Sequence, residues 1–230
     1  MINYFEGHTL LINKPLKWTS FDVVKKIRNT LKPHSVGKKL KVGHAGTLDP
    51  LADGLLIICT GKYTKKIQEF QALEKEYTGV FTLGATTPSF DLETAIDRQF
   101  PVNHISKDML DSVAHNLTGQ IEQTPPLYSA IKQNGKRLYE LARKGEKVSI
   151  KKRKVLVSEF EITKIDMPNI WVRIKCSKGT YIRSLADSFG KKLNSGAYLS
   201  QLTRTKIGPY SLHEAVDIQT FTESIEQENL

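Results

Sequence analysis

The order of apolar and polar positions along the chain predicts an α+β fold. Five segments have the length and composition of strands: residues 10–12, 55–59, 77–83, 155–162 and 170–177. Apolar residues at helical spacing predict helices within three segments: residues 20–31, 109–117 and 182–193. These strands and helices do not follow a regular βαβ rhythm. A mixed or antiparallel sheet flanked by helices is therefore expected.

The first helix has clear start and stop signals. The run Thr19-Ser20-Phe21-Asp22 matches a capping box, in which the side chains of the first and fourth residues bond to each other's backbone N–H groups. Pro33 cannot continue a helix. We therefore expect this helix to begin at Thr19 and to end just before Pro33.

The most unusual local sequence is residues 43–54, which hold three glycines and a proline and predict a loop. Asp49 precedes Pro50, which biases it towards an extended conformation. A carboxylate held on such a loop is a candidate nucleophile or base, although a solvated Asp-Pro turn is the commoner outcome. A calcium loop starting at Asp49 is excluded, because its third and twelfth positions are Leu51 and Thr60.

A second candidate lies at residues 177–184, where the predicted strand 170–177, in which apolar and polar residues alternate, meets the last predicted helix. Arg183 falls in the first turn of that helix, where the macrodipole disfavours a cation. Arg183 and the free N–H groups of the helix end could together hold an anion such as Asp49. The alternative is an exposed arginine on a helix end. Tyr77 opens a strand, and by itself it reads as half-buried packing.

Composition limits the other classes of function. The 230 residues are 39% hydrophobic, and the longest apolar run, residues 55–59, is too short to span a bilayer. Residues 1–8 lack the pattern of a signal peptide, and the two cysteines suggest no disulfide framework. The six histidines show no metal-ligand spacing. We expect a single cytoplasmic domain over residues 1–230, without a metal.

The positive charge is concentrated in two stretches. The formal net charge is +10, and residues 25–41 contain seven Lys or Arg and no acid. Residues 132–154 contain ten Lys or Arg and only two acids. Residues 210–230 form a short tail that is acidic from residue 214 onward. Such stretches favour a polyanionic partner, the alternative being a generally basic, solvated surface. Residues 124–154 read as an extended basic excursion from the core.

Four motifs, in order, resemble the TruB-type bacterial tRNA pseudouridine synthases over essentially the whole chain. Residues 43–54 (GHAGTLDPLADG) resemble the family's catalytic-aspartate motif, and residues 14–20 (KPLKWTS) are similar to its Lys-Pro motif. Residues 127–139 resemble the segment that grips the tRNA T-arm. Residues 178–183 (KGTYIR) resemble the motif that supplies an arginine partner.

The resemblance implies a pseudouridine synthase fold, with an active-site cleft across a central mixed sheet. It implies isomerisation of the T-loop uridine, position 55 of tRNA, after that base has flipped out of its stack. No cofactor is implied, because product and substrate are isomers. The implied site residues are the nucleophile Asp49, its partner Arg183, Tyr77 beneath the base, Tyr181 and Leu202 lining the uracil pocket, His44 where the base leaves the loop, and the RNA-binding Lys14 and Lys132.

The sequence departs from the family's pattern at two places. Lys17 stands where the family usually has glycine, and only about twenty residues follow Tyr210, so the C-terminal RNA-binding PUA domain of larger members is expected to be absent. A monomer that acts on the T-arm without an obligatory protein partner is expected. Two rival hypotheses remain: a non-catalytic RNA-binding module, and a guide-RNA-dependent synthase subunit that needs partner proteins.

The two basic stretches predict a strong dependence of tRNA affinity on salt. Each phosphate contact releases counterions, so raising the salt from about 50 to about 200 mM should weaken binding at least about tenfold. Filter binding or fluorescence anisotropy over a salt series measures this. A flat response between low and moderate salt would contradict the prediction.

Overall fold

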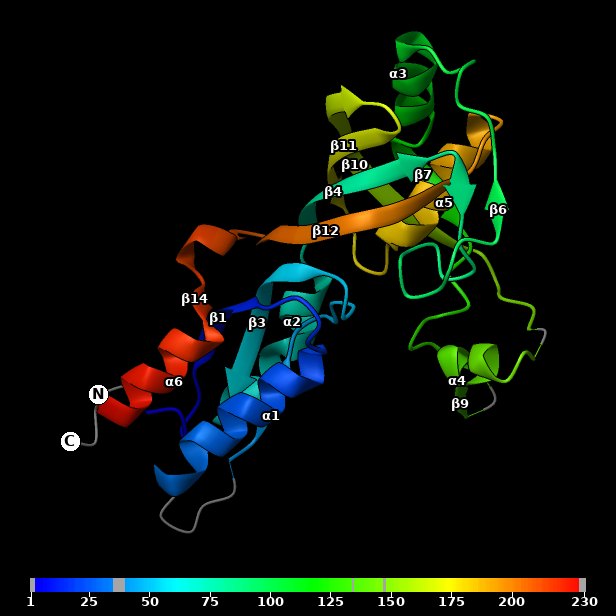
Figure 1. Cartoon of the computed structure of the whole chain (residues 1–230). Helices are drawn as coiled ribbons and strands as arrows, with labels where there is room; N and C mark the ends of the chain where they lie inside the picture. Colours follow the sequence, from blue (N-terminus) through cyan, green and yellow to red (C-terminus); the bar gives the residue numbers. More distant parts are fainter. Residues whose placement is uncertain (1–2, 35–39, 134, 147, 228–230) are drawn as a thin grey trace. The chain divides into compact units, whose positions relative to one another are not determined.

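The computed structural model describes residues 3–34, 40–133, 135–146 and 148–227 (Figure 1). Three lysines of the predicted basic stretches, Lys38, Lys39 and Lys147, therefore lie outside the described residues. The chain divides into two compact units: unit 1 comprises Met1–Tyr77 and Leu202–Leu230, and unit 2 comprises Thr78–Gln201. Strands β4 (Lys75–Leu83) and β12 (Ala197–Ile207) each pass from one unit into the other.

Unit 1 combines short strands with helices at both ends of its sequence. Its other strands are β1 (Thr9–Lys14), β2 (Val42–His44), β3 (Asp53–Thr60), β13 (Tyr210–Ser211) and β14 (Val216–Asp217). Its helices are α1 (Ser20–Leu31), α2 (Ile67–Ala72) and α6 (Ile218–Gln227), with 3-10 turns at Lys32–His34, Gly61–Lys66 and Leu212–Glu214.

The strands of unit 1 pair in both directions. Strand β3 runs antiparallel to β1 and β2, whereas its pairing with β12 is parallel. Strand β14 adds a parallel partner on the other side of β1. The expected mixed sheet is confirmed in this unit.

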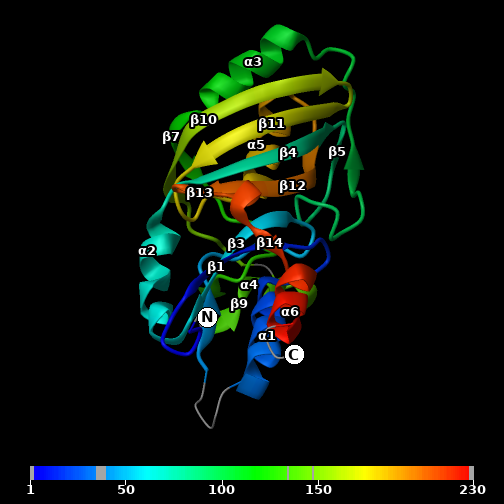
Figure 2. The same ribbon diagram turned by 90° about the vertical axis from the view of Figure 1, so that its left-hand side faces the viewer.

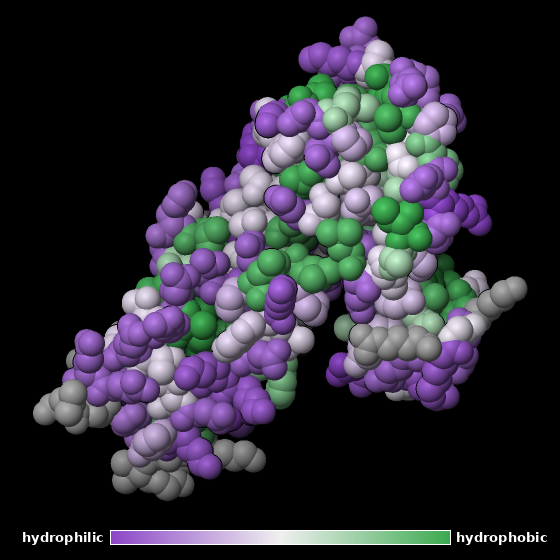
Figure 3. All heavy atoms as spheres, viewed as in Figure 1, coloured by the Kyte–Doolittle hydropathy of each residue, from purple (hydrophilic) through white to green (hydrophobic). Residues whose placement is uncertain are grey.

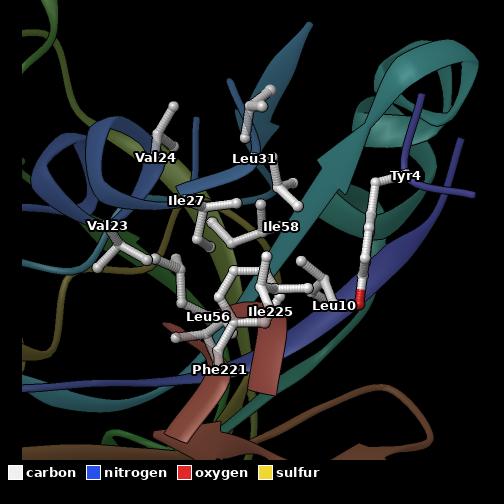
Figure 4. Close-up of a cluster of buried hydrophobic side chains, with 12 residues drawn as sticks. Tyr4, Leu10, Val23, Val24, Ile27, Leu31, Leu56, Ile58, Phe221 and Ile225 are labelled. Carbon is white, nitrogen blue, oxygen red and sulfur yellow. The ribbon is translucent and has the colours of Figure 1, made fainter. Parts of the chain in front are cut away.

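Helix α1 begins as the sequence predicts. Thr19 Oγ1 accepts a hydrogen bond from the Asp22 N–H at 3.1 Å, and the Asp22 carboxylate accepts one from the Thr19 N–H at 2.9 Å. The buried stripe of α1 includes Val23 and Ile27 and packs against β1, β3 and α6 to form one core, with Phe221 and Ile225 contributed by α6 (Figure 4). The C-terminal residues therefore complete the core of unit 1.

Unit 2 is built on a sheet in which β12, β4, β11 (Asn169–Cys176), β10 (Arg153–Asp166) and β7 (Gly119–Gln123) follow one another (Figure 2). Its helices are α3 (Lys107–Asn116), α4 (Leu138–Arg143) and α5 (Ile182–Lys192). Two short hairpins complete it, formed by β5 (Ala85–Thr86) with β6 (Arg98–Gln99) and by β8 (Lys132–Gln133) with β9 (Lys136–Arg137).

Helix α5 lies against one face of this sheet. Phe189 of α5 stacks on Phe160 of β10 and meets Phe81 of β4 edge-on, with ring centroids 5.7 and 5.8 Å apart. Such aromatic pairs contribute about 0.5–1.5 kcal/mol each beyond the area that they bury. This cluster holds α5, whose first turn carries Arg183, against the sheet.

Strand β11 has the predicted alternation, but its outer face is not a free basic surface. Its inner residues are buried and its outer residues are half-buried. Arg173 pairs with Glu159 and Glu161 across the antiparallel β10, and Lys175 lies 2.7 Å from Glu159. Hydrogen bonds from Lys175 and Arg173 lower the pKa of Glu159. These cations are therefore largely neutralised by carboxylates of the same sheet.

The segment 124–154 contains the β8–β9 hairpin and α4, which lie apart from the strands of unit 2 (Figure 1). Many hydrophilic side chains cover it in Figure 3. The predicted loop 43–54 is shorter than expected, because β2 includes Gly43 and His44 and β3 already starts at Asp53. None of the helices in the described part of the chain is long and apolar enough to cross a lipid bilayer.

Candidate active site

Asp49 lies at the head of a tight turn between β2 and β3. The Ala52 N–H donates to the Asp49 carbonyl at 3.1 Å, and Pro50 follows Asp49 as the sequence predicts. The Asp49 side chain is half-buried. The carboxylate therefore sits on a short, hydrogen-bonded turn rather than on a long loose loop.

The N-terminal Lys-Pro segment, residues 14–20, holds this turn through hydrogen bonds. Ser20 Oγ accepts from the Leu48 N–H at 2.8 Å and donates to the Leu48 carbonyl at 3.2 Å, so it fixes the residue next to Asp49. The Lys17 N–H donates to the Pro50 carbonyl at 2.7 Å. Lys17 has φ +68°, in the left-handed region that favours glycine. The glycine that the family usually has at this position would adopt such a conformation without strain, whereas Lys17 adopts it despite its side chain.

Arg204, in β12, also holds the turn in place. It is 1% exposed and donates from Nε to the Leu55 carbonyl at 2.7 Å and from Nη2 to the Gly46 carbonyl at 3.1 Å. Gly54, with φ +101°, is its partner in the parallel β3–β12 pairing. A β-carbon at Gly54 would lie 2.5 Å from the Arg204 carbonyl oxygen, so glycine is required for this close approach.

Lys14, at the end of β1, is a fully buried cation in the same unit. Its ammonium group donates to the Trp18 carbonyl at 2.6 Å and to the Pro15 carbonyl at 3.0 Å. Burial lowers the pKa of Lys14 to about 8, while Asp53 and Asp49 act in the opposite direction. Lys14 thus holds the Lys-Pro turn and shares an electrostatic environment with Asp49.

His44, the last residue of β2, has a pKa below the ordinary value for histidine. Burial is the main cause that lowers its pKa, and the Arg204 charge acts in the same direction. The neutral form of the imidazole is therefore favoured.

Arg183 is buried rather than exposed, so the alternative of an exposed arginine on a helix end is wrong. It is 3% exposed in the first turn of α5. Nη2 donates to the Tyr128 carbonyl at 3.0 Å, Nη1 donates to the Ser89 carbonyl at 3.2 Å, and Nε lies 3.5 Å from the Asp91 carboxylate. The guanidinium therefore connects the first residues of the 124–154 segment to the loop that carries Asp91.

Tyr181 is the N-cap residue of α5, and its backbone is held by a buried amide. Gln123, which is 3% exposed, accepts from the Tyr181 N–H at 2.8 Å and donates to the Tyr181 carbonyl at 3.1 Å. This two-bond contact fixes the Tyr181 backbone against β7 and satisfies one of the free N–H groups at the helix end.

The remaining predicted residues lie on strands. Tyr77 is half-buried in β4, and Leu202, in β12, is 9% exposed. Lys132 is exposed in β8, within the 124–154 segment. Lys14, His44, Asp49, Tyr77 and Leu202 belong to unit 1, whereas Lys132, Tyr181 and Arg183 belong to unit 2.

Sequence reasoning missed the buried polar residues that support these motifs, namely Ser20, Asp91, Gln123 and Arg204. Ser20 was identified only as part of a capping box, and no strand was predicted around Arg204. The one available signal was Gly54, because a glycine at the start of a strand often marks a close backbone approach. Among the described residues, no group of three or more His, Cys, Asp or Glu could hold a metal ion.

Comparisons with known proteins point to one family. Residues 32–182 match the family model described as "TruB family pseudouridylate synthase (N terminal domain)". A curated relative from Flavobacterium johnsoniae, named tRNA pseudouridine synthase B, is 57% identical over 97% of this chain and 98% of its own length. A relative of the same name from Phocaeicola vulgatus is 50% identical over the whole of this chain and 97% of its own length.

A solved structure resembles the chain as well. The crystal structure of a Cbf5-Nop10-Gar1 complex includes a chain with a TM-score of 0.73 and 27% identity to this one. The match covers 96% of this chain but only 54% of that one. This similarity confirms the predicted fold class.

Removing the Arg204 guanidinium should loosen the Asp49 turn. Arg204→Met leaves the buried carbonyls of Gly46 and Leu55 without these donors, and the free energy of unfolding should fall by about 2–4 kcal/mol. Urea denaturation measures the change. Lys206→Met, two residues along the same strand and exposed, is the matched control and should cost less than about 1 kcal/mol. Equal effects of the two substitutions would contradict this role of Arg204.

Lys14 should make stability depend on pH in the alkaline range. Its pKa is about 8 in the folded protein, against 10.5 for an ordinary lysine, so the unfolded chain binds more protons between these pH values. The free energy of unfolding of the wild type, relative to Lys14→Met, should therefore rise by roughly 2–3 kcal/mol as the pH increases from 8 to 10.5. Denaturant titrations of both proteins over this range measure it, and a constant difference would refute the lowered pKa.

Proposed function

Because the chain belongs to the TruB family of pseudouridylate synthases, we propose that it converts a uridine of tRNA into pseudouridine. The match of residues 32–182 to the family, together with relatives named tRNA pseudouridine synthase B over nearly their full lengths, carries this proposal. The substrate is the T-loop uridine at position 55, as the resemblance of residues 127–139 to the T-arm segment implies.

Asp49 is the nucleophile of the proposed reaction. It attacks either C1′ of the ribose or C6 of the uracil, the bond between N1 and C1′ breaks, and a new bond forms between C5 and C1′. The proton on C5 is lost and N1 gains one, so substrate and product have the same composition. The rigid turn supports this role, because a positioned nucleophile avoids part of the entropic cost of reaching the transition state.

Arg183 is the proposed partner of Asp49. A neighbouring guanidinium keeps a carboxylate ionised, as a nucleophile requires. The resemblance of residues 178–183 to the family's arginine motif supports this pairing. In it, Asp49 joins Asp91, which lies 3.5 Å from Arg183 Nε, as a second carboxylate near the guanidinium.

The other site residues take the roles that the motifs imply. Tyr77 lies beneath the target base and takes part in proton transfer, Tyr181 and Leu202 line the uracil pocket, and His44 packs where the flipped base leaves the loop. Lys132 contributes to RNA binding as part of the 124–154 segment, whereas the buried Lys14 supports binding indirectly, by holding the Lys-Pro turn in place. A splayed base and a structured stem-loop are the features by which proteins recognise RNA loops.

Replacing the proposed nucleophile should separate turnover from binding. Asp49→Asn should reduce turnover by at least about a thousandfold while tRNA affinity changes little, because an amide keeps the shape but cannot act as the nucleophile. Release of tritium from a T-arm stem-loop carrying 5-tritiated uridine measures turnover, since the reaction removes the hydrogen on C5.

Asp53→Asn is the matched control. Asp53 lies four residues further along and accepts from Thr203 Oγ1 at 2.6 Å, a bond that an asparagine oxygen can also accept. This variant should keep most of the activity. Retained turnover in Asp49→Asn would refute the assignment, and no tritium release from the wild type would favour the non-catalytic RNA-binding module. Wild-type turnover on the isolated stem-loop, without other proteins, would exclude a requirement for guide RNA.

A further inference from the structure

Arg153, the first residue of β10, is a half-buried arginine that the proposed mechanism does not use. The alternation of β10 places it on the inner face of the strand with Val155 and Val157, which are buried, while Lys154 and Leu156 are exposed. Its guanidinium makes neither a hydrogen bond nor an ion pair with any residue that the structure describes. Its side chain therefore lies on the same face of β10 as the buried residues Val155 and Val157.

The guanidinium lies beside the motif that carries Tyr181. Its central carbon is 5.6 Å from the centroid of the Tyr181 ring, within the range of a cation–π contact. Gly179 has φ +81°, and a β-carbon there would lie 3.5 Å from Arg153 Nη1. The arginine therefore packs over the side chain of a pocket residue and against a glycine that leaves room for it.

The surrounding backbone is fixed. Arg153 is the register partner of Gln123 in the antiparallel β7–β10 pairing, and Gln123 holds the Tyr181 backbone through two hydrogen bonds. The strand pair thus carries Arg153 at the start of β10 and Gln123 at the end of β7, and Gln123 holds the backbone of Tyr181. A side chain held in place in this way loses less entropy when it binds a ligand.

The ligand that suits this guanidinium is an anion. A partly desolvated arginine without a carboxylate partner is costly, and its planar set of five N–H donors matches the oxygens of a phosphate. Glu122, the register partner of Lys154 on β7, is exposed, and its carboxylate lies 3.9 Å from the ammonium group of Lys152 rather than beside Arg153. A neutral uracil would offer only carbonyl oxygens to the same donors, which is the weaker partner for a charge.

We propose that Arg153 binds a phosphodiester next to the flipped uridine and so holds the nucleotide while its base enters the pocket. This proposal rests on the proposed function, because Tyr181 belongs to the uracil pocket only if the chain is a pseudouridine synthase. It adds to that function a contact that restrains the RNA backbone at the site of reaction.

The first experiment compares Arg153→Gln with Lys154→Gln in the full-length protein. The two residues are adjacent, but only Arg153 faces Tyr181. Arg153→Gln should weaken binding of a T-arm stem-loop about tenfold or more, and should reduce the salt dependence by about one phosphate contact. Lys154→Gln should change the affinity by less than about threefold. Equal losses for both variants would show a diffuse charge effect and overturn the proposal.

The second experiment identifies the phosphate. Uncharged methylphosphonates replace, one at a time, the phosphates on the 5′ and 3′ sides of the target uridine in the stem-loop. One of these substitutions should weaken binding to the wild type but not to Arg153→Gln, because the two changes remove the same contact. Additive losses at both positions would mean that Arg153 acts only by supporting Tyr181, and the proposal would fail.

Affinity and turnover separate this proposal from the proposed function. Wild-type protein that binds the stem-loop without releasing tritium refutes the synthase activity while the phosphate contact is still measured. Normal turnover and unchanged affinity in Arg153→Gln refute the contact while the activity stands.

Discussion

The arrangement of the candidate active site depends on one buried cation, Arg204, bound to backbone carbonyls. An uncompensated guanidinium in a protein interior is strongly destabilising, so the chain must supply acceptors wherever this side chain lies. The carbonyls of Gly46 and Leu55 are those acceptors, and they belong to the two arms of the turn that carries Asp49. The turn cannot move away without leaving the charge unsolvated. Rigidity of the proposed nucleophile is therefore a consequence of satisfying a buried charge.

The same principle applies in unit 2. Arg183 is buried, and its donors reach the Ser89 and Tyr128 carbonyls, so it joins two segments that are distant in sequence. The 124–154 segment starts beside this contact. Arg183 is thus both the proposed partner of Asp49 and the residue that holds the start of the segment proposed to bind RNA.

The sequence predicted the features that depend on local chemistry. The capping box at Thr19 and Asp22 and the alternation in β11 each involve neighbours within a few residues, and both are confirmed. The glycines and proline of residues 43–54 placed Asp49 correctly on a turn, and the strand-to-helix pattern placed Arg183 correctly in a first helical turn. What could not be predicted depends on pairing across long stretches of chain. Arg204 is buried only because β12 pairs in parallel with β3, and no pattern around residue 204 indicates that register. The ion pairs of Arg173 likewise depend on its register with Glu159 and Glu161.

The ion pairs on the outer face of β11 also affect where a polyanion would collect. Arg173 and Lys175 carry counterions that the fold itself provides, so a nucleic acid approaching this face would have to displace glutamates rather than small mobile cations. The entropy of counterion release, which drives the association of basic proteins with RNA, is reduced there. This face of the sheet therefore attracts a nucleic acid only weakly. The long-range attraction comes instead from basic residues that have no acidic neighbours. A protein with a high net charge can thus direct its substrate by neutralising some of its own cations.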